Sequence, residues 1–333
     1  MPVVLQTIRH VDNPWFQAWL DQLRGLGLTP ATLTWAGLRR AGSGDWLQLQ
    51  WPEFALSPPR TRHALVGTAR LLQQTVYARA RGLRVLLSVH NLRSHAQQHP
   101  RLETTFWWLL TRLVTDVHAL TAAARLEILA AHPALRTARW TVVPHGDLGL
   151  PRSPLTRQQA RARTGLPDGR VALLFGTVRA SKGFVAYAEH PPPPGWTVVV
   201  AGACPDRRIY KTLCRYQGLG RVLRLRHHTD DELADLLAAC DLAVLPSASA
   251  LNSATALHAL SAGRPVAVPD TPTFAELAAQ VGPGWVLPGH PVPVSDDLTG
   301  FQPPPTARPD LSVHAPEAVR AAQRRLFGLP PVR

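Results

Sequence analysis

The sequence predicts an α/β protein made of two Rossmann-like lobes, each with a parallel sheet. Short apolar runs alternate with amphipathic runs along most of the chain, which is typical of parallel strands joined by helices. A segment rich in proline and turn residues interrupts this alternation near residue 150 and indicates a linker. The length of 333 residues suits two domains of roughly 100–200 residues each.

The first predicted lobe covers residues 1–150. Its first helix is marked by Pro14 near the start and Gly27 after the end, because these residue types favour helix starts and stops. The predicted strands are 3–8, 47–50, 84–89, 116–120 and 140–143, and the predicted helices are 15–26, 62–81, 102–114 and 122–131.

The second predicted lobe covers residues 151–315, and a final helix and tail cover 316–333. Prolines break the pattern between 288 and 316 and indicate an extended loop. The predicted strands are 171–175, 197–201, 222–225, 242–245 and 265–268, and the predicted helices are 157–163, 206–216, 230–239, 253–261, 273–279 and 317–327. Ligands bind such sheets at the carboxyl ends of the strands, so we expect the cleft between the lobes to hold the site.

Composition narrows the functional classes. The net charge of +14 would suit nucleic acid or phosphorylated ligands, but the basic residues form no recognisable nucleic-acid module, and we expect no specific nucleic-acid partner. The three cysteines show neither CxxC spacing nor an even count, which argues against disulfides and zinc. With no secretory signal or membrane span in the sequence, we expect a cytoplasmic protein.

Two segments of the second lobe carry the features of an anion site. After the strand at 171–175 come Gly176, which allows close backbone approach, then Arg179 and Lys182, which can neutralise a diphosphate. One of only two lysines in the chain lies here; the alternative is a pair of solvated charges. The second segment leads from the strand at 242–245 to a helix start at Asn252, Ser253, Ala254 and Thr255, where free N–H groups favour anions.

Two histidines follow strands of the first lobe. His90 precedes Asn91 after the strand at 84–89, and His145 precedes Gly146 after the strand at 140–143. A lone histidine is more often structural, but two at equivalent strand ends favour a function in the expected cleft. The motifs GxGxxG, GxxxxGK[ST], HExxH and GxSxG do not occur, which removes the simplest dehydrogenase, kinase, metalloprotease and hydrolase interpretations.

The ordered segments HNL, PHG, FGxxRxxKG and NSAxxxxALSxGRPVAVP resemble GT-B glycosyltransferases of the large nucleotide-sugar group typified by family GT4. Asn13-Pro14-Trp15 and the segment from His90 to His95 are similar to those of a bacterial subgroup that builds exopolysaccharides or lipid-linked glycans. The resemblance implies a GT-B fold and transfer of a hexose from a GDP- or UDP-sugar to a glycan or lipid-linked acceptor.

The resemblance also implies residue roles. Arg179 and Lys182 would hold the donor diphosphate and, with His90 at the reaction centre, are the candidate catalytic residues. The other donor-binding candidates are Gly176, Asn252, Ser253, Ala254, Thr255 and His258, and the cleft or acceptor candidates are Asn13, Asn91, His95, His145 and Gly146. No cofactor and no metal is expected, because cationic side chains and amides stabilise the leaving diphosphate and no DxD motif is present.

Departures from the family pattern leave alternatives open. Ala250 and His258 stand where the common pattern has two glutamates, and Gln48 and Gln50 replace two histidines of an HLHWPE segment. A GT-B-like scaffold that binds a nucleotide or glycan without turnover is therefore the alternative function. Retention and inversion both stay open; for inversion, His90 or Asp147 would be the general base.

The predicted helix at 102–114 carries Phe106, Trp107 and Trp108 and has two interpretations. It could contact a membrane that carries a lipid-linked acceptor, which would place the protein peripherally on the inner face of the membrane. The favoured interpretation is that at least one of the two tryptophans packs in the core, because they are adjacent in the sequence. The polar flanks of the helix disfavour the membrane interpretation.

Overall fold

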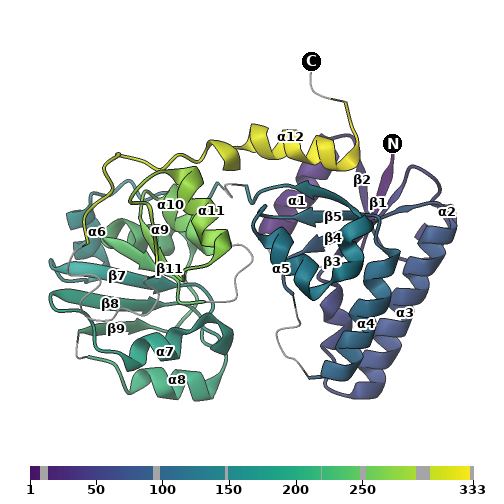
Figure 1. Ribbon diagram of the computed structural model, residues 1–333. Coiled ribbons are helices and arrows are strands. Elements are labelled where there is room, and N and C mark those ends of the chain that lie inside the picture. Colours follow the sequence, from purple (N-terminus) through teal and green to yellow (C-terminus); the bar gives the residue numbers. More distant parts are fainter. Residues whose placement is uncertain are drawn as a thin grey trace. The chain divides into compact units, whose positions relative to one another are not determined.

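In the computed structural model, the described residues are 1–7, 14–92, 98–146, 149–218, 220–247, 253–289 and 301–330. The chain forms two compact units: Met1–Leu148 with Pro316–Arg333, and Gly149–Ala315 (Figure 1). Each unit contains a six-stranded sheet, and the strands pair in parallel. The predicted α/β class with two parallel sheets is confirmed.

The sheet of the first unit has the order β2-β1-β3-β4-β5-β6. Its strands are β1 (Val3–Gln6), β2 (Thr29–Thr32), β3 (Trp46–Gln50), β4 (Arg84–Val89), β5 (Asp116–Ala119) and β6 (Arg139–Val142). Its helices are α1 (Pro14–Gly25), α2 (Trp35–Arg40), α3 (Thr61–Ala80), α4 (Pro100–Leu113) and α5 (Ala124–Ala131), with the 3₁₀-helices η1 (Pro52–Leu56) and η2 (Pro133–Thr137).

The sheet of the second unit has the order β12-β11-β10-β7-β8-β9. Its strands are β7 (Arg170–Phe175), β8 (Trp196–Ala201), β9 (Arg221–Arg224), β10 (Leu242–Val244), β11 (Val266–Val268) and β12 (Val286–Pro288). Its helices are α6 (Arg157–Thr164), α7 (Phe184–Glu189), α8 (Arg207–Cys214), α9 (Asp230–Ala239), α10 (Ala254–Ser261) and α11 (Pro272–Val281), with the 3₁₀-helices η3 (Ala180–Lys182) and η4 (Ser312–His314).

The second sheet is covered on both faces. Along β7, Val171, Leu173 and Phe175 pack into the cluster formed with α6, α9, α10 and α11. The alternate residues Ala172 and Leu174 pack toward α7 and α8. Because successive side chains of a strand point to opposite faces, a strand buried on both sides is a continuous apolar run, as the sequence shows here.

The final helix, α12 (Pro316–Phe327), belongs to the first unit although it follows the second in the chain. Val319, Leu326 and Phe327 are buried in one cluster with Trp19 and Trp46. The apolar side chains of α12 thus pack into the hydrophobic core formed by residues from the first 146 positions of the chain.

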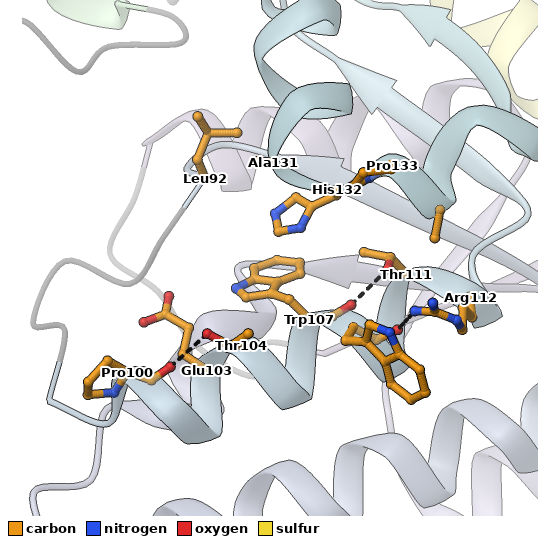
Figure 2. A pocket seen from close by; sticks show the side chains of 12 residues that line it. Leu92, Pro100, Glu103, Thr104, Trp107, Thr111, Arg112, Ala131, His132 and Pro133 are labelled. Atoms are coloured by element: carbon orange, nitrogen blue, oxygen red, sulfur yellow. Dashed lines mark hydrogen bonds between the residues drawn. The ribbon is translucent and has the colours of Figure 1, made fainter.

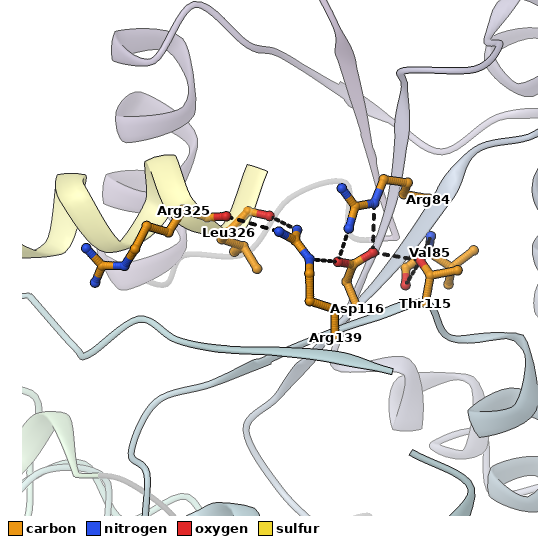
Figure 3. A network of polar contacts seen from close by, with 7 residues as sticks. All are labelled: Arg84, Val85, Thr115, Asp116, Arg139, Arg325 and Leu326. Atoms are coloured by element: carbon orange, nitrogen blue, oxygen red, sulfur yellow. Dashed lines mark hydrogen bonds and ion pairs between the residues drawn. The ribbon is translucent and has the colours of Figure 1, made fainter. Parts of the chain in front are cut away.

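A buried carboxylate joins α12 to the sheet (Figure 3). Asp116 is fully buried and accepts hydrogen bonds from Arg84 Nε at 3.0 Å and Arg139 Nε at 2.7 Å. Arg139 also donates to the carbonyl oxygens of Arg325 and Leu326 at the end of α12. A cation near a helix C-terminus is favourable because of the helix dipole, so the arginine fixes the end of α12 against β5.

Among the strands and α-helices, β2, α2, α7 and β12 were not predicted from the sequence, nor were the short 3₁₀-helices η1 to η4. Among the helices of the described ranges, none has both the length and the apolar character that crossing a bilayer requires. The helix α4 has Phe106 and Trp107 buried and Trp108 56% exposed, which confirms that one of the two tryptophans packs in the core.

Candidate functional site

The loop after β7 in the second unit depends on close backbone packing between two glycines. Gly176 has a φ of +98°, and Gly202, after β8, has a φ of +150°. A Cβ atom on Gly202 would lie 2.0 Å from the carbonyl oxygen of Gly176, a distance that no side chain tolerates. The two glycines therefore bring the carboxyl ends of β7 and β8 together and set the path of the loop that carries Arg179 and Lys182.

Lys182 and the start of α10 meet at one cavity of about 150 Å³ in the second unit. Ser253, Ala254 and Thr255 line it together with Lys182, as do Phe175, Phe184 and Pro246. Lys182 turns back over the end of β7, since its Nζ lies 3.3 Å from where a Cβ of Gly176 would be. Ser247 Oγ donates to the carbonyl oxygen of Ser181 at 3.3 Å and links the loops after β10 and β7. Four predicted donor-binding residues are thus brought together.

The electrostatics of this cavity favour an anion. The Ser253 hydroxyl caps α10 by accepting from Ala256 N at 3.0 Å, while the other N–H groups of a first helical turn have no partner within the helix. Burial, with a smaller contribution from Arg179, lowers the pKa of Lys182. A bound anion would offset the unfavourable burial of the ammonium group.

The other predicted donor residues have different positions. Arg179 is exposed and is not among the residues that line the cavity. His258 lies one turn into α10, where its ring meets Phe175 edge to face at 5.7 Å; Phe175 lines the cavity. Asn252 lies outside the described residues.

In the first unit, His90 is held between two tryptophans at the end of β4. Its ring stacks on Trp51 at 4.3 Å and meets Trp15 edge to face at 4.6 Å. The Nε2 atom lies 2.8 Å from Gln50 Oε1, so it carries the ring proton when it donates to this amide oxygen. Burial, followed by the nearby His118 and His145, holds the pKa of His90 well below its usual value. The imidazole is therefore neutral at pH 7.

Trp51 adopts a left-handed backbone conformation with a φ of 43°, which is uncommon for a large side chain and is found at functional sites. The conformation ends β3 and starts η1, which carries Glu53. His145 also contacts Trp15, with ring centroids 5.5 Å apart. The structure therefore brings His90 and His145 together around one tryptophan.

A chain of buried polar side chains crosses the carboxyl ends of four strands. Gln48 Oε1 accepts from Gln6 Nε2 at 2.7 Å, and Gln48 Nε2 donates to Ser88 Oγ at 2.8 Å. Ser88 Oγ is 3.1 Å from His118 Nδ1, and His118 Nε2 is 3.1 Å from the carbonyl oxygen of Val143. Burial lowers the pKa of His118 to about 4. This neutral network aligns the strand ends that carry His90.

Glu53 is a candidate functional residue that the sequence analysis missed. Its side chain is buried, with 4% of the residue exposed, and Oε1 accepts a hydrogen bond from Asn91 Nδ2 at 2.9 Å. Burial raises its pKa to about 7; the Asn91 hydrogen bond opposes this and the nearby Glu103 adds to it. A carboxyl group that titrates near neutral pH suits general acid–base chemistry. The available signal was its place two residues after Trp51 in the Trp-Pro-Glu segment.

Asn13 and His95, which were predicted on the acceptor side, lie outside the described residues, as does Asp147. Gly146 is described and half-buried. Across the described ranges, no group of three or more histidine, cysteine, aspartate and glutamate side chains is arranged to hold a metal ion.

The chain is similar to known glycosyltransferases. Residues 178–296 match the family model described as Glycosyl transferases group 1. GDP-mannose:glycolipid 4-beta-D-mannosyltransferase of Xanthomonas campestris pv. campestris is 30% identical over 252 residues, which are 73% of this chain and 66% of the relative. Mannosylfructose-phosphate synthase of Agrobacterium fabrum is 28% identical over 170 residues, 46% of this chain and 37% of the relative.

Solved structures share the architecture. HepE of Anabaena, in complex with UDP and glucose, has 16% identity and a TM-score of 0.59, with 98% of this chain and 95% of that chain covered. Sucrose-phosphate synthase of Thermosynechococcus elongatus has 16% identity and a TM-score of 0.63, with 98% and 94% covered. The fold is thus the two-lobe α/β fold of GT-B glycosyltransferases, and the family-model match lies in the second unit. The chain spans just under two thirds of the length of the mannosyltransferase relative.

Proposed function

We propose that this protein is a glycosyltransferase that moves a hexose from a GDP- or UDP-sugar to a glycan or lipid-linked acceptor. The observation that carries the proposal is the convergence of Lys182 with Ser253, Ala254 and Thr255 on one cavity of the second unit. The group 1 family-model match over residues 178–296 and the GDP-mannose-dependent relative support a nucleotide-sugar donor.

The second unit supplies the leaving-group chemistry in this proposal. The donor diphosphate binds against the Lys182 ammonium and the N–H groups at the start of α10. As the bond between the anomeric carbon and the phosphate oxygen breaks, negative charge grows on the diphosphate. Fixed donors that face the position of this charge stabilise the transition state most. Arg179, exposed on the same loop, would close on the bound diphosphate.

The first unit supplies the proton acceptor. His90 is a poor base, because its pKa is lowered and its Nε2 faces the Gln50 side chain. Ionised Glu53 is better matched, with a pKa of about 7. Its carboxylate takes the proton of the acceptor hydroxyl while the hydroxyl oxygen bonds to the anomeric carbon and the nucleoside diphosphate leaves. This base-assisted displacement inverts the anomeric centre. Inversion agrees with the β configuration given in the name of the mannosyltransferase relative.

The proposal extends to the metal requirement and the location of the enzyme. We infer that the enzyme needs no divalent cation, because Lys182 and the α10 amides would neutralise the diphosphate. A cytoplasmic location, with peripheral contact to the inner face of the membrane, fits a lipid-linked acceptor; the relative from Xanthomonas is named for a glycolipid acceptor.

The test uses the two lysines of the chain as a matched pair. Lys182 lines the cavity, whereas Lys211 is exposed on α8. A thermal-shift panel with UDP, GDP, ADP, dTDP and CMP, with and without magnesium, measures binding; a ligand at 100 times its Kd stabilises by ~2.7 kcal/mol. We expect one nucleotide to stabilise the wild type and Lys211→Ala without magnesium, and Lys182→Ala to lose the shift. Equal shifts in both variants would refute the donor site.

The alternative is a GT-B-like scaffold that binds a nucleotide without turnover. It is favoured by His258, which stands at one of the two glutamate positions of the common pattern and contacts Phe175. The two functions differ in donor hydrolysis. Release of nucleoside diphosphate from a nucleotide sugar by the wild type, reduced in Glu53→Gln, supports the enzyme, and binding without release supports the scaffold.

A further inference from the structure

The first unit contains a second cavity, of about 450 Å³, that the roles above do not use. It lies between α4 on one side and the end of α5 with η2 on the other, and Leu92 lies at one end (Figure 2). Its volume is in the range of small-molecule binding sites. The cavity lies wholly within the first unit.

Aromatic rings form a large part of its lining. Trp107 is 5% exposed, and its ring faces that of His132 at a centroid distance of 4.8 Å (Figure 2). Within the described part of the chain, the buried Nε1 of Trp107 has no hydrogen-bond partner. Such a buried N–H is unfavourable unless something accepts from it, so this lining indicates a ligand that carries an acceptor.

Polar groups accompany the aromatic rings along the cavity. Glu103 and Thr104, which follow one another on α4, both line it and lie beside Pro100 (Figure 2). At the far end Arg112 lies over the exposed ring of Trp108, 3.9 Å from its centroid. A ligand that combines apolar faces with hydroxyl groups matches this mixture: its C–H faces pack on the indole rings and its oxygens accept from Trp107. Carbohydrates have this chemistry, whereas a hydrocarbon chain would leave the Trp107 N–H unpaired.

The cavity adjoins the groups proposed to take the acceptor proton. Leu92 follows Asn91 directly, and Asn91 binds Glu53. Glu103, which lines the cavity, is close enough to Glu53 to raise the pKa of that carboxyl group. A sugar chain seated along α4 could therefore present its terminal hydroxyl at Glu53.

We propose that the cavity between α4 and the α5–η2 segment binds the carbohydrate part of the acceptor, with Trp107 as its stacking platform. This inference rests on the proposed glycosyltransferase function. It assigns the sugar portion, and not the lipid, as the part of the acceptor that the first unit recognises.

Two neighbouring threonines on α4 offer a matched test. Thr104 and Thr105 are both exposed, and each hydroxyl donates to the carbonyl oxygen four residues earlier, at 3.0 and 3.1 Å. Thr104 lines the cavity and Thr105 does not. Thr104→Trp fills the cavity from its rim without altering the core, and Thr105→Trp adds the same bulk elsewhere on the helix.

The probes are a printed glycan array and vesicles of phosphatidylcholine with phosphatidylglycerol, applied to the full chain. We expect the wild type and Thr105→Trp to bind the same glycans and Thr104→Trp to bind them at least about tenfold more weakly, as filling a pocket by a bulky side chain implies. Trp107→Phe, which keeps a ring and removes the N–H, should weaken the same glycans.

Three results would overturn the inference: no glycan binding by the wild type, equal binding by both tryptophan variants, or loss of vesicle binding alone in Thr104→Trp. Donor hydrolysis, measured in parallel, separates this outcome from failure of the proposed function. If the wild type hydrolyses donor but both tryptophan variants bind glycans equally, the cavity assignment is wrong and the enzyme assignment stands. If glycans bind the cavity but no donor is hydrolysed, the cavity assignment stands and the enzyme assignment is wrong.

Discussion

Replacing Glu53 by glutamine should make the first unit more stable at neutral pH and change how its stability depends on pH. In the folded protein the Glu53 carboxyl group has a pKa of about 7, against an ordinary value of 4.5. Between these values the folded state keeps a proton that the unfolded state has lost. The free energy of unfolding therefore falls as the pH rises from 4.5 to 7. Glutamine does not titrate, and its Oε1 can still accept from Asn91.

The magnitude follows from the width of this interval. A pKa difference of about 2.5 at 1.36 kcal/mol per pH unit gives roughly 3 kcal/mol. The stability of Glu53→Gln relative to the wild type should increase by this amount between about pH 4.5 and pH 7 and be constant on either side. Urea unfolding at a series of pH values measures it. Tryptophan fluorescence reports mainly on the first unit, which holds all of the ten tryptophans except Trp196 and Trp285.

A control separates this effect from the general titration of the chain. Glu317 is exposed in the first turn of α12, and Glu317→Gln should leave the difference from the wild type nearly flat across the same range. If the Glu53→Gln difference is also flat, or grows in favour of the wild type as the pH rises, the buried carboxyl group is not protonated at neutral pH and the reasoning fails. In the proposed enzyme, kcat/KM should also rise with pH through about 7, because the base acts when ionised, and Glu53→Gln should remove this rise.

Two further predictions concern the second unit. Asp241→Ala should destabilise this unit by about 3–5 kcal/mol in urea unfolding. The reason is that Arg161, which is 8% exposed and donates to Asp241 Oδ2 at 2.7 Å, would stay buried without its carboxylate. A loss of stability below about 1 kcal/mol would contradict the role of this ion pair. Gly202→Ala should abolish nucleotide-induced thermal shifts, because its Cβ would meet the Gly176 carbonyl oxygen at 2.0 Å. Gly195→Ala is the control, because Gly195 has a φ of +77° but open space around the added Cβ. It should lower the stability by about 1–2 kcal/mol and keep the nucleotide-induced shifts. Loss of these shifts in both variants would indicate a general effect of replacing a glycine in left-handed backbone.

Interior strands were predictable because burial on both faces leaves a continuous apolar run. The strands β4 and β7 were predicted to within one residue, since each lies between other strands of its sheet. The strands β2 and β12 occupy sheet edges and were missed. The sequence of β2 is Thr-Pro-Ala-Thr, which has no apolar run; proline is tolerated there because an edge strand need not donate every backbone hydrogen bond.

The donor side was easier to predict than the acceptor side. Lys182 and the start of α10 are signalled by local features, namely a scarce residue after a strand and a helix cap. Glu53 acquires its properties from Asn91, 38 positions away, and from burial, and neither is readable from the residues next to it. The buried Gln48 and Gln50 were noted only as replacements, although β3 reads Trp-Leu-Gln-Leu-Gln, an alternation that placed both amides on one side of a strand.

The discontinuity of the first unit has a consequence for biosynthesis. Residues 149–315, which form the second unit, are translated as one uninterrupted segment and can complete their fold while translation continues. The first unit begins earlier but finishes later, because Val319, Leu326 and Phe327 of α12 belong to its core. Until α12 has left the ribosome, the apolar surface around Trp19 and Trp46 that α12 covers stays open to water. A nascent chain that stalls within residues 149–315 would therefore expose an incomplete first unit, a state that invites chaperone binding or aggregation.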